Sequence, residues 1–115
     1  MKTFTLVRRQ VSDVSILDVV GDLVLCPETH LMRQQIEGVM EEGHRKILLN
    51  LARVNYVDST GMGVLVGAKT AALARNVQLK LCCVPTLVAQ LLGHLQLTKL
   101  LDVHDQESLA LDSFS

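Results

Sequence analysis

The sequence predicts an α/β domain with a mixed, mainly parallel β-sheet covered by helices. Short segments rich in aliphatic and β-branched residues alternate with longer segments whose apolar residues recur every three or four positions. The chain has 115 residues, of which 49% are hydrophobic, and this length suits one domain with one core. No linker, repeat or low-complexity tract interrupts the pattern. We therefore expect residues 1–115 to form a single domain.

Two strands are expected close together at the start of the chain. Residues 3–9 alternate apolar and polar side chains, as a half-exposed strand does. After a short turn at residues 11–13, a second strand is expected over residues 14–20, ended by the Gly-Asp pair at 21–22. Strands separated by so few residues predict a hairpin.

An amphipathic helix is expected next, over residues 27–42. Pro27 suits the first helical position, where its missing N–H is not needed, and Gly43 stops the helix. The nearly continuous apolar run K-I-L-L-N-L at residues 46–51 is typical of a strand in the interior of a sheet, covered on both faces.

The second half of the chain repeats this alternation, which gives the overall order β-β-α-β-α-β-α-β-α. The expected elements are a helix over 59–75 closed by Asn76, a strand over 77–83, a helix from Pro85 to Gly93 that buries Leu87, Val88, Leu91 and Leu92, a strand over 100–103, and a terminal helix capped by Asp105 that carries Leu109 and Ala110.

Composition excludes several classes of function. The formal net charge is −1 with scattered charges, and aromatic residues are only 3%, so neither a nucleic-acid nor an anionic-membrane surface is expected. No segment approaches the roughly 20 apolar residues of a membrane span, and the N-terminus lacks a signal peptide. Cys26, Cys82 and Cys83 fit reduced thiols and show no metal-binding spacing. A cytoplasmic protein without a metal site is expected.

The stretch from Val54 to Ala72 is the most informative part of the chain. Asp58, Ser59 and Thr60 are residue types that cap helices, so the hydroxyls of Ser59 and Thr60 are expected at the mouth of a helix and near solvent. Three glycines follow, and each costs roughly 1 kcal/mol against alanine inside a helix. They are Gly61, Gly63 and Gly67. Either the underlying sheet or a docking partner must therefore approach this helix closely.

Two catalytic or nucleotide-binding interpretations are weak. A serine hydrolase needs G-x-S-x-G, but Val57 and Asp58 precede Ser59, and nothing selects a histidine partner. A phosphate-binding loop needs lysine directly after its second glycine, whereas Ala68 precedes Lys69. A packed helix with Lys69 in solvent is expected instead, and no enzyme activity.

The helix start at Ser59 has two remaining interpretations. In the first, it is a cap and nothing else. In the second, it is a phosphorylation switch, because a phosphate adds nearly two negative charges. The helix dipole and free N–H groups are expected to accommodate the phosphate without unfolding, while a partner packed on the helix would be expelled.

The motif N-Y-V-D-S-T-G-M-G-V-L at residues 55–65 resembles the STAS domain, specifically the stand-alone bacterial anti-sigma factor antagonists. The resemblance extends over G-D-L after the second strand, the strand K-I-L-L-N-L, and the tail from Gly93. It implies partner switching in transcription regulation and stress response. The unphosphorylated antagonist binds a serine-kinase anti-sigma factor, the kinase phosphorylates it to release it, and a PP2C-type phosphatase reverses the modification. ATP belongs to the kinase, so no cofactor is implied.

By position, the resemblance implies that Ser59 is the phosphorylated residue, with Thr60 as second choice. Two positions depart from the family pattern: Val24 and Asn50 each stand where an aspartate is common. A non-switching scaffold or a transporter-associated subunit is the alternative. The implied partner-binding residues are Asp58, Thr60, Gly61, Met62, Gly63, Asp22 and Val24.

Overall fold

The computed structural model describes residues 4–24 and 27–114, and for residues 27 and 28 the backbone alone. The predicted strand residue Thr3 and the predicted thiol of Cys26 lie outside the described residues. The elements are β1 (Phe4–Val11), β2 (Val14–Leu23), α1 (Pro27–Glu41), β3 (Lys46–Val57), α2 (Ser59–Ala74), β4 (Gln78–Cys82), α3 (Thr86–His94), β5 (Val103–His104) and α4 (Glu107–Ser113).

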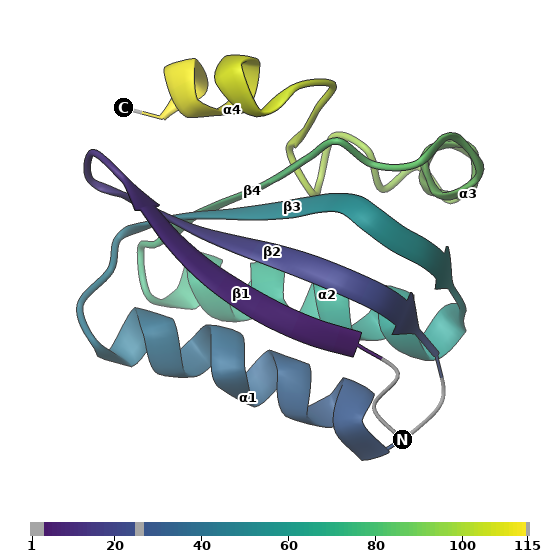
Figure 1. Cartoon of the computed structure of the whole chain (residues 1–115), viewed down its shortest axis with the longest axis horizontal. Helices are drawn as coiled ribbons and strands as arrows, with labels where there is room; N and C mark the ends of the chain where they lie inside the picture. Colours follow the sequence, from purple (N-terminus) through teal and green to yellow (C-terminus); the bar gives the residue numbers. More distant parts are fainter. Residues whose placement is uncertain (1–3, 25–26, 115) are drawn as a thin grey trace.

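The described strands form one mixed sheet in the order β1-β2-β3-β4-β5. The hairpin strands β1 and β2 are antiparallel, whereas β2, β3, β4 and β5 are mutually parallel. Helices α1 and α2 lie side by side beneath the sheet, and α4 lies over the opposite face (Figure 1). The predicted α/β class, the mainly parallel sheet and the order of elements are confirmed.

The central strand β3 is buried on both faces along its first half, as its apolar run predicted. Ile47, Leu49 and Leu51 face the larger core, which they share with α1 and α2. Leu48 points to the other side and packs in a smaller core with Ala110 of α4. Side chains alternate across a strand, so one continuous apolar run serves both cores.

Two strands are longer than the sequence patterns predicted. β3 continues past the apolar run to Val57, and β2 continues through residues 21–22 to Leu23. Their second halves pair with each other through register shifts between Asp18 and Val20 and between Gly21 and Asp22. The second halves of β2 and β3 contain many polar residues, so no apolar pattern predicts them as strands. They are strands because their backbones pair with each other. The extension carries the end of β2 alongside the start of α2.

The C-terminal third departs most from expectation. Strand β5 is Val103–His104, not 100–103, and the residue that caps α4 is Gln106, not Asp105. On α3, Val88 and Leu92 are buried as predicted, but Leu87 and Leu91 are exposed. A helix at the end of a small sheet has too little surface beneath it to bury a four-residue face.

Lys69 also differs from expectation, because it does not lie in solvent. Its Nζ donates a hydrogen bond to the Leu79 carbonyl at 2.8 Å, and burial lowers the pKa of this lysine. The ammonium group is therefore tied to β4, which further weakens the phosphate-loop interpretation. Across residues 4–24 and 27–114, no helix is long and apolar enough to cross a membrane.

Candidate functional site

The start of α2 is held in place by Asp58, which is the N-cap residue. Its Oδ1 accepts hydrogen bonds from the backbone N–H groups of Thr60 at 2.9 Å and Gly61 at 3.0 Å. The Asp58 N–H donates to the Leu23 carbonyl at 3.0 Å, which fastens the cap to the end of β2. Because Asp58 performs the capping, Ser59 becomes the first helical residue, exposed to solvent, and Thr60 is half-buried.

The three glycines of α2 have three different surroundings. A Cβ at Gly61 would lie only 2.7 Å from Leu23 Cβ, so this glycine lets the helix sit against the end of β2. A Cβ at Gly67 would lie 3.1 Å from Arg33 Nη1 of α1. A Cβ at Gly63 would meet nothing within 4 Å. Internal packing therefore accounts for Gly61 and partly for Gly67, but it does not account for Gly63.

A shallow apolar groove of about 620 Å³ runs along one side of the helix start. Its apolar character comes largely from Tyr56, Leu91 and Leu95, which are 59%, 37% and 52% exposed. Leu87, Leu91 and Leu95 recur at four-residue steps and so form one stripe along α3. The groove is lined by Tyr56, Val57, Asp58, Ser59, Met62, Gly63, Val66, Leu91 and Leu95. We call it the apolar groove.

A second hollow, of about 340 Å³, lies on the other side of the helix start, between α1 and α2. It is lined by His30, Arg33, Ser59, Thr60, Gly63 and Val64, and we call it the basic hollow. Ser59 and Gly63 line both the apolar groove and the basic hollow. These two residues therefore form a ridge, with an apolar surface on one side and basic side chains on the other.

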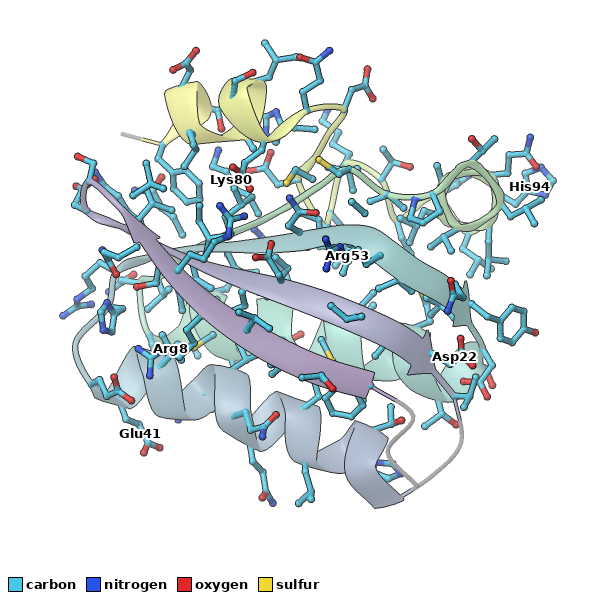
Figure 2. All side chains as sticks on the ribbon, viewed as in Figure 1. Arg8, Asp22, Glu41, Arg53, Lys80 and His94 are labelled. Carbon is cyan, nitrogen blue, oxygen red and sulfur yellow. The ribbon has the colours of Figure 1, made fainter. Side chains whose placement is uncertain are left out.

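The structure brings the sequence-distant segments G-D-L-V and D-S-T-G together. Asp22 pairs with Tyr56 in the β2–β3 register, and Figure 2 shows it near the end of the sheet from which α2 starts. The Val24 carbonyl accepts a hydrogen bond from Thr29 Oγ1 at 2.6 Å. Asp22 and Val24 thus lie beside the helix start, but neither lines the apolar groove or the basic hollow. Met62 is buried and lines the apolar groove.

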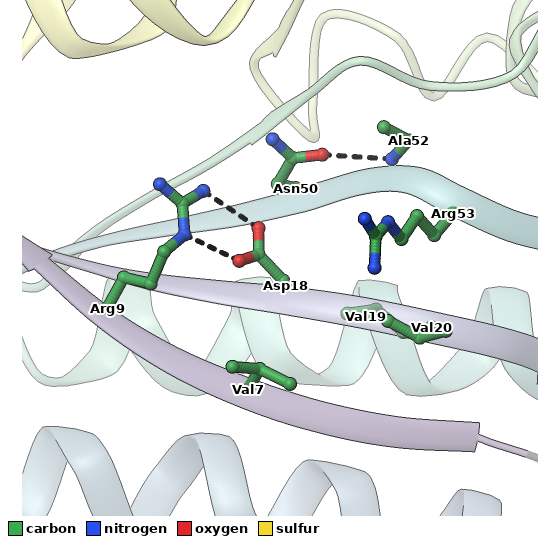
Figure 3. A pocket seen from close by; sticks show the side chains of 8 residues that line it. All are labelled: Val7, Arg9, Asp18, Val19, Val20, Asn50, Ala52 and Arg53. Atoms are coloured by element: carbon green, nitrogen blue, oxygen red, sulfur yellow. Dashed lines mark hydrogen bonds and ion pairs between the residues drawn. The ribbon is translucent and has the colours of Figure 1, made fainter.

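The open face of the sheet carries a separate hollow of about 310 Å³ (Figure 3). Its polar side chains serve the fold. Arg9 donates to Asp18 Oδ1 at 2.8 Å and also pairs with Glu107 of α4, which raises the pKa of Arg9 and lowers that of Glu107. Asn50 donates to Glu107 at 3.0 Å and accepts from the Ala52 N–H at 2.9 Å. This cluster joins β1, β2 and β3 to α4.

A Ser-His-Asp cluster occurs elsewhere, but its geometry does not suit catalysis. Ser113 Oγ and Asp102 Oδ1 lie 3.3 Å and 3.0 Å from the same atom, His104 Nε2. A catalytic triad uses both ring nitrogens, one for the serine and one for the acid. Among the described residues, no hydrogen bond joins Ser59 to a histidine, and no group of three or more His, Cys, Asp or Glu side chains could hold a metal ion.

The cysteines likewise fit a structural role. Cys82 is buried in the smaller core, and Cys83 is half-buried. Burial is the main reason that the pKa of the Cys82 thiol is raised. A thiol kept protonated in this way is a poor nucleophile.

The chain belongs to the STAS domain family, whose model matches residues 5–110. Solved structures agree on the fold. A putative anti-sigma factor antagonist from Thermotoga maritima superposes with a TM-score of 0.81 at 22% identity, covering 93% of this chain and 92% of that one. The anti-sigma factor antagonist SpoIIAA in its unphosphorylated form gives 0.77 at 20% identity, covering 94% of each chain.

A solved structure with a different description is also similar. A sulfate transporter family protein from Wolinella succinogenes superposes with a TM-score of 0.72 at 22% identity, covering 89% of this chain and 84% of that one. At such low identities the likeness to solved structures shows a shared fold. Function must therefore be argued from the residues around the start of α2.

The structure places the residues of the predicted site together, with further residues on either side of them. Asp58, Ser59, Thr60, Gly61, Met62 and Gly63 lie together at the helix start, as the D-S-T-G-M-G motif indicated. The sequence patterns missed Tyr56, Leu91 and Leu95 on one side and His30 and Arg33 on the other. The sequence predicts Leu87 and Leu91 in the core and makes no prediction for Leu95, although the three recur at four-residue steps.

Proposed function

We propose that this protein is an anti-sigma factor antagonist that works by partner switching. In its unphosphorylated form it binds a serine-kinase anti-sigma factor and frees the sigma factor. The kinase then transfers the γ-phosphoryl group of ATP to Ser59 Oγ, and the antagonist is released. A PP2C-type phosphatase restores the hydroxyl. On this proposal the protein is a single cytoplasmic domain that acts by binding, not by catalysis.

One observation carries the proposal: Ser59 is exposed on the ridge beside the apolar groove, at a helix start that Asp58 holds rigidly. A partner that covers the groove must also cover the serine. Leu87 is 79% exposed and continues the apolar stripe of α3, so the apolar surface offered to a partner extends beyond the groove. The bare backbone at Gly63 allows a partner to approach α2 closely.

Phosphorylation would change this surface without disturbing the core. Ser59 contributes no side-chain hydrogen bond to the cap, because Asp58 makes both of the bonds to the N–H groups of the first turn. A phosphate there adds nearly two negative charges at the edge of an apolar contact. Desolvating those charges under a partner is costly, so the partner dissociates while the domain stays folded.

The experiment combines modification with binding. A serine-kinase anti-sigma factor recovered from the native cell is incubated with ATP and the protein, and the modified residue is located by mass spectrometry. We expect phosphate on Ser59, none on Ser59→Ala, and wild-type affinity for Ser59→Ala. Ser59→Glu should bind at least tenfold more weakly, or roughly 1.4 kcal/mol. Phosphate on another residue would refute the assignment of Ser59.

A non-switching scaffold or transporter-associated subunit is the second candidate, favoured by Val24 in place of the usual aspartate. The same variants separate the two functions. A scaffold whose interface lies away from the ridge binds its partner equally well as wild type and as Ser59→Glu, because the new charge stays outside that interface. A partner-switching protein binds its partner more tightly as wild type than as Ser59→Glu.

A further inference from the structure

His30 and Arg33 of the basic hollow have no part in the proposed binding surface, yet the hollow opens at the same serine. Ser59 and Thr60 line it from α2, and His30 and Arg33 line it from α1. Helices α1 and α2 run side by side beneath the sheet (Figure 1), so their first turns face each other. Two residues that can carry positive charge therefore stand beside the two hydroxyls that are candidates for phosphorylation.

A phosphate on Ser59 needs countercharge from outside its own helix turn. The sequence suggested that free N–H groups at the helix start would receive it, but the Thr60 and Gly61 N–H groups already donate to Asp58 Oδ1. The Asp58 carboxylate also places a negative charge next to the phosphoserine. Like charges at such short distance destabilise each other. The nearest basic side chains that share a hollow with Ser59 are His30 and Arg33.

The guanidinium of Arg33 can move toward a phosphate on Ser59. Its Nε pairs with Glu37 on the same helix at 3.3 Å, but this pair is exposed, with the Arg33 side chain at 50%. Exposed ion pairs of this kind contribute little. The Nη1 end of the guanidinium lies over Gly67, about two helical turns from Ser59, so it must swing along α2 to reach a phosphate. A phosphate dianion offers more charge and more acceptor oxygens than Glu37, so the guanidinium can turn toward it.

We propose that the basic hollow is the internal receptor of the phosphoryl group, in which Arg33 and His30 neutralise phosphoserine 59. This inference rests on the proposed phosphorylation of Ser59 and specifies how the modified state is stabilised. The phosphate is drawn to the α1 side of the ridge and is paired within the domain. The partner then faces an occupied ridge and has lost any contact with Arg33 and His30.

The test uses the full chain with phosphoserine incorporated at position 59 by genetic encoding, so that no kinase is needed. Phosphorus NMR follows the second ionisation of the phosphate in wild type and in Arg33→Gln. A guanidinium that pairs with the phosphate at about 5 Å would lower this pKa, so its removal in Arg33→Gln should raise the phosphate pKa by about half a pH unit. Arg53→Gln is the matched control, because Arg53 is an exposed arginine on the open face of the sheet, as Figure 3 shows.

The same samples report on His30. The ring-proton NMR signals of His30 should shift at a fixed pH when Ser59 carries phosphate, because a nearby anion changes the electrostatic environment of the imidazole. The Asp58 carboxylate that caps α2 and Glu37, which pairs with Arg33 and with Arg75, are present in every sample. The proposal is overturned if the phosphate titrates alike in Arg33→Gln and Arg53→Gln, or if the ring signals of His30 do not move when Ser59 is phosphorylated. A protein that no kinase phosphorylates would refute the proposed function but leave this measurement readable.

Discussion

Two glycines of α2 provide a matched pair of substitutions with opposite expected effects on stability. Gly61 and Gly63 lie on the same helix, two residues apart, and neither has a positive φ. Alanine at either position gains the same helix propensity, roughly 1 kcal/mol. The surroundings differ. The new Cβ at Gly61 meets the Leu23 carbonyl and lies 2.7 Å from Leu23 Cβ, whereas the new Cβ at Gly63 meets nothing within 4 Å.

The size of the stability change in Gly61→Ala depends on which atoms must move to make room for the new Cβ. At Gly61 the obstacle is backbone and a buried side chain at the end of β2, which cannot swing aside as a flexible side-chain end can. Overpacking of this kind costs about 1–3 kcal/mol, and the upper part of that range applies. After the gain in helix propensity, Gly61→Ala should destabilise the fold by about 1–2 kcal/mol, while Gly63→Ala should stabilise it by up to about 1 kcal/mol.

Urea unfolding monitored by circular dichroism measures both variants against wild type. Both variants gain the same helix propensity, so it cancels when their unfolding free energies are subtracted. The difference gives the steric cost at Gly61 alone, about 2–3 kcal/mol. In thermal unfolding this corresponds to a Tm difference of roughly 10 °C for a domain of this size. Equal stabilities, or a Gly63→Ala variant less stable than wild type, would show that the close approach at Leu23 does not govern this helix. Gly63→Ala should nevertheless weaken binding of the partner kinase, because its methyl group stands on the ridge.

The other predictions concern the apolar groove and the ion pairs of α4. Leu91→Ala, at a residue 37% exposed, should weaken partner binding and cost clearly less stability than Leu92→Ala, a fully buried neighbour whose truncation should cost about 2–5 kcal/mol. Binding and urea titrations on both variants check this, and equal losses of stability would contradict the assignment of Leu91 to the surface. Hydrogen bonding to Arg9 lowers the pKa of Glu107 from its ordinary value of 4.5. Its stabilising contribution, about 1 kcal/mol for a partly exposed pair, is therefore present above that value and is lost as pH falls through the folded-state pKa. Glu107→Gln should be less stable than wild type at neutral pH and equal to it in strong acid, and a difference that does not change with pH would refute this.

The helix start shows how far local sequence can specify a site. Residue type alone put Asp58, Ser59 and Thr60 at the entrance of a helix, because capping requires a short polar side chain within one turn. Which of the three caps the helix was decided by the tertiary structure. The Asp58 N–H is fixed by the Leu23 carbonyl, which orients the Asp58 carboxylate toward the first turn and leaves Ser59 outside.

For the strands and for α3 as well, local sequence predicted one part of the structure and tertiary contacts decided the other. Apolar runs identified the buried first half of β3, since hydrophobic periodicity is a local property of the chain. The second half of β3 depends on pairing with β2 across register shifts, which no local pattern encodes. Leu87 and Leu91 have the spacing of a core face, and only the limited extent of the sheet beneath α3 leaves them exposed.

By itself, the sequence determined the α/β class, the order of the elements and the serine at the head of the central helix, because these follow from periodicity and capping chemistry within short segments. Only the tertiary structure decided what surrounds that serine. The apolar groove requires α3 to lie beside α2, and the basic hollow requires the first turns of α1 and α2 to meet. Both join residues distant in the chain. The basic hollow follows from α1 and α2 running side by side beneath the sheet, whereas α3 approaches the start of α2 with its axis across theirs (Figure 1).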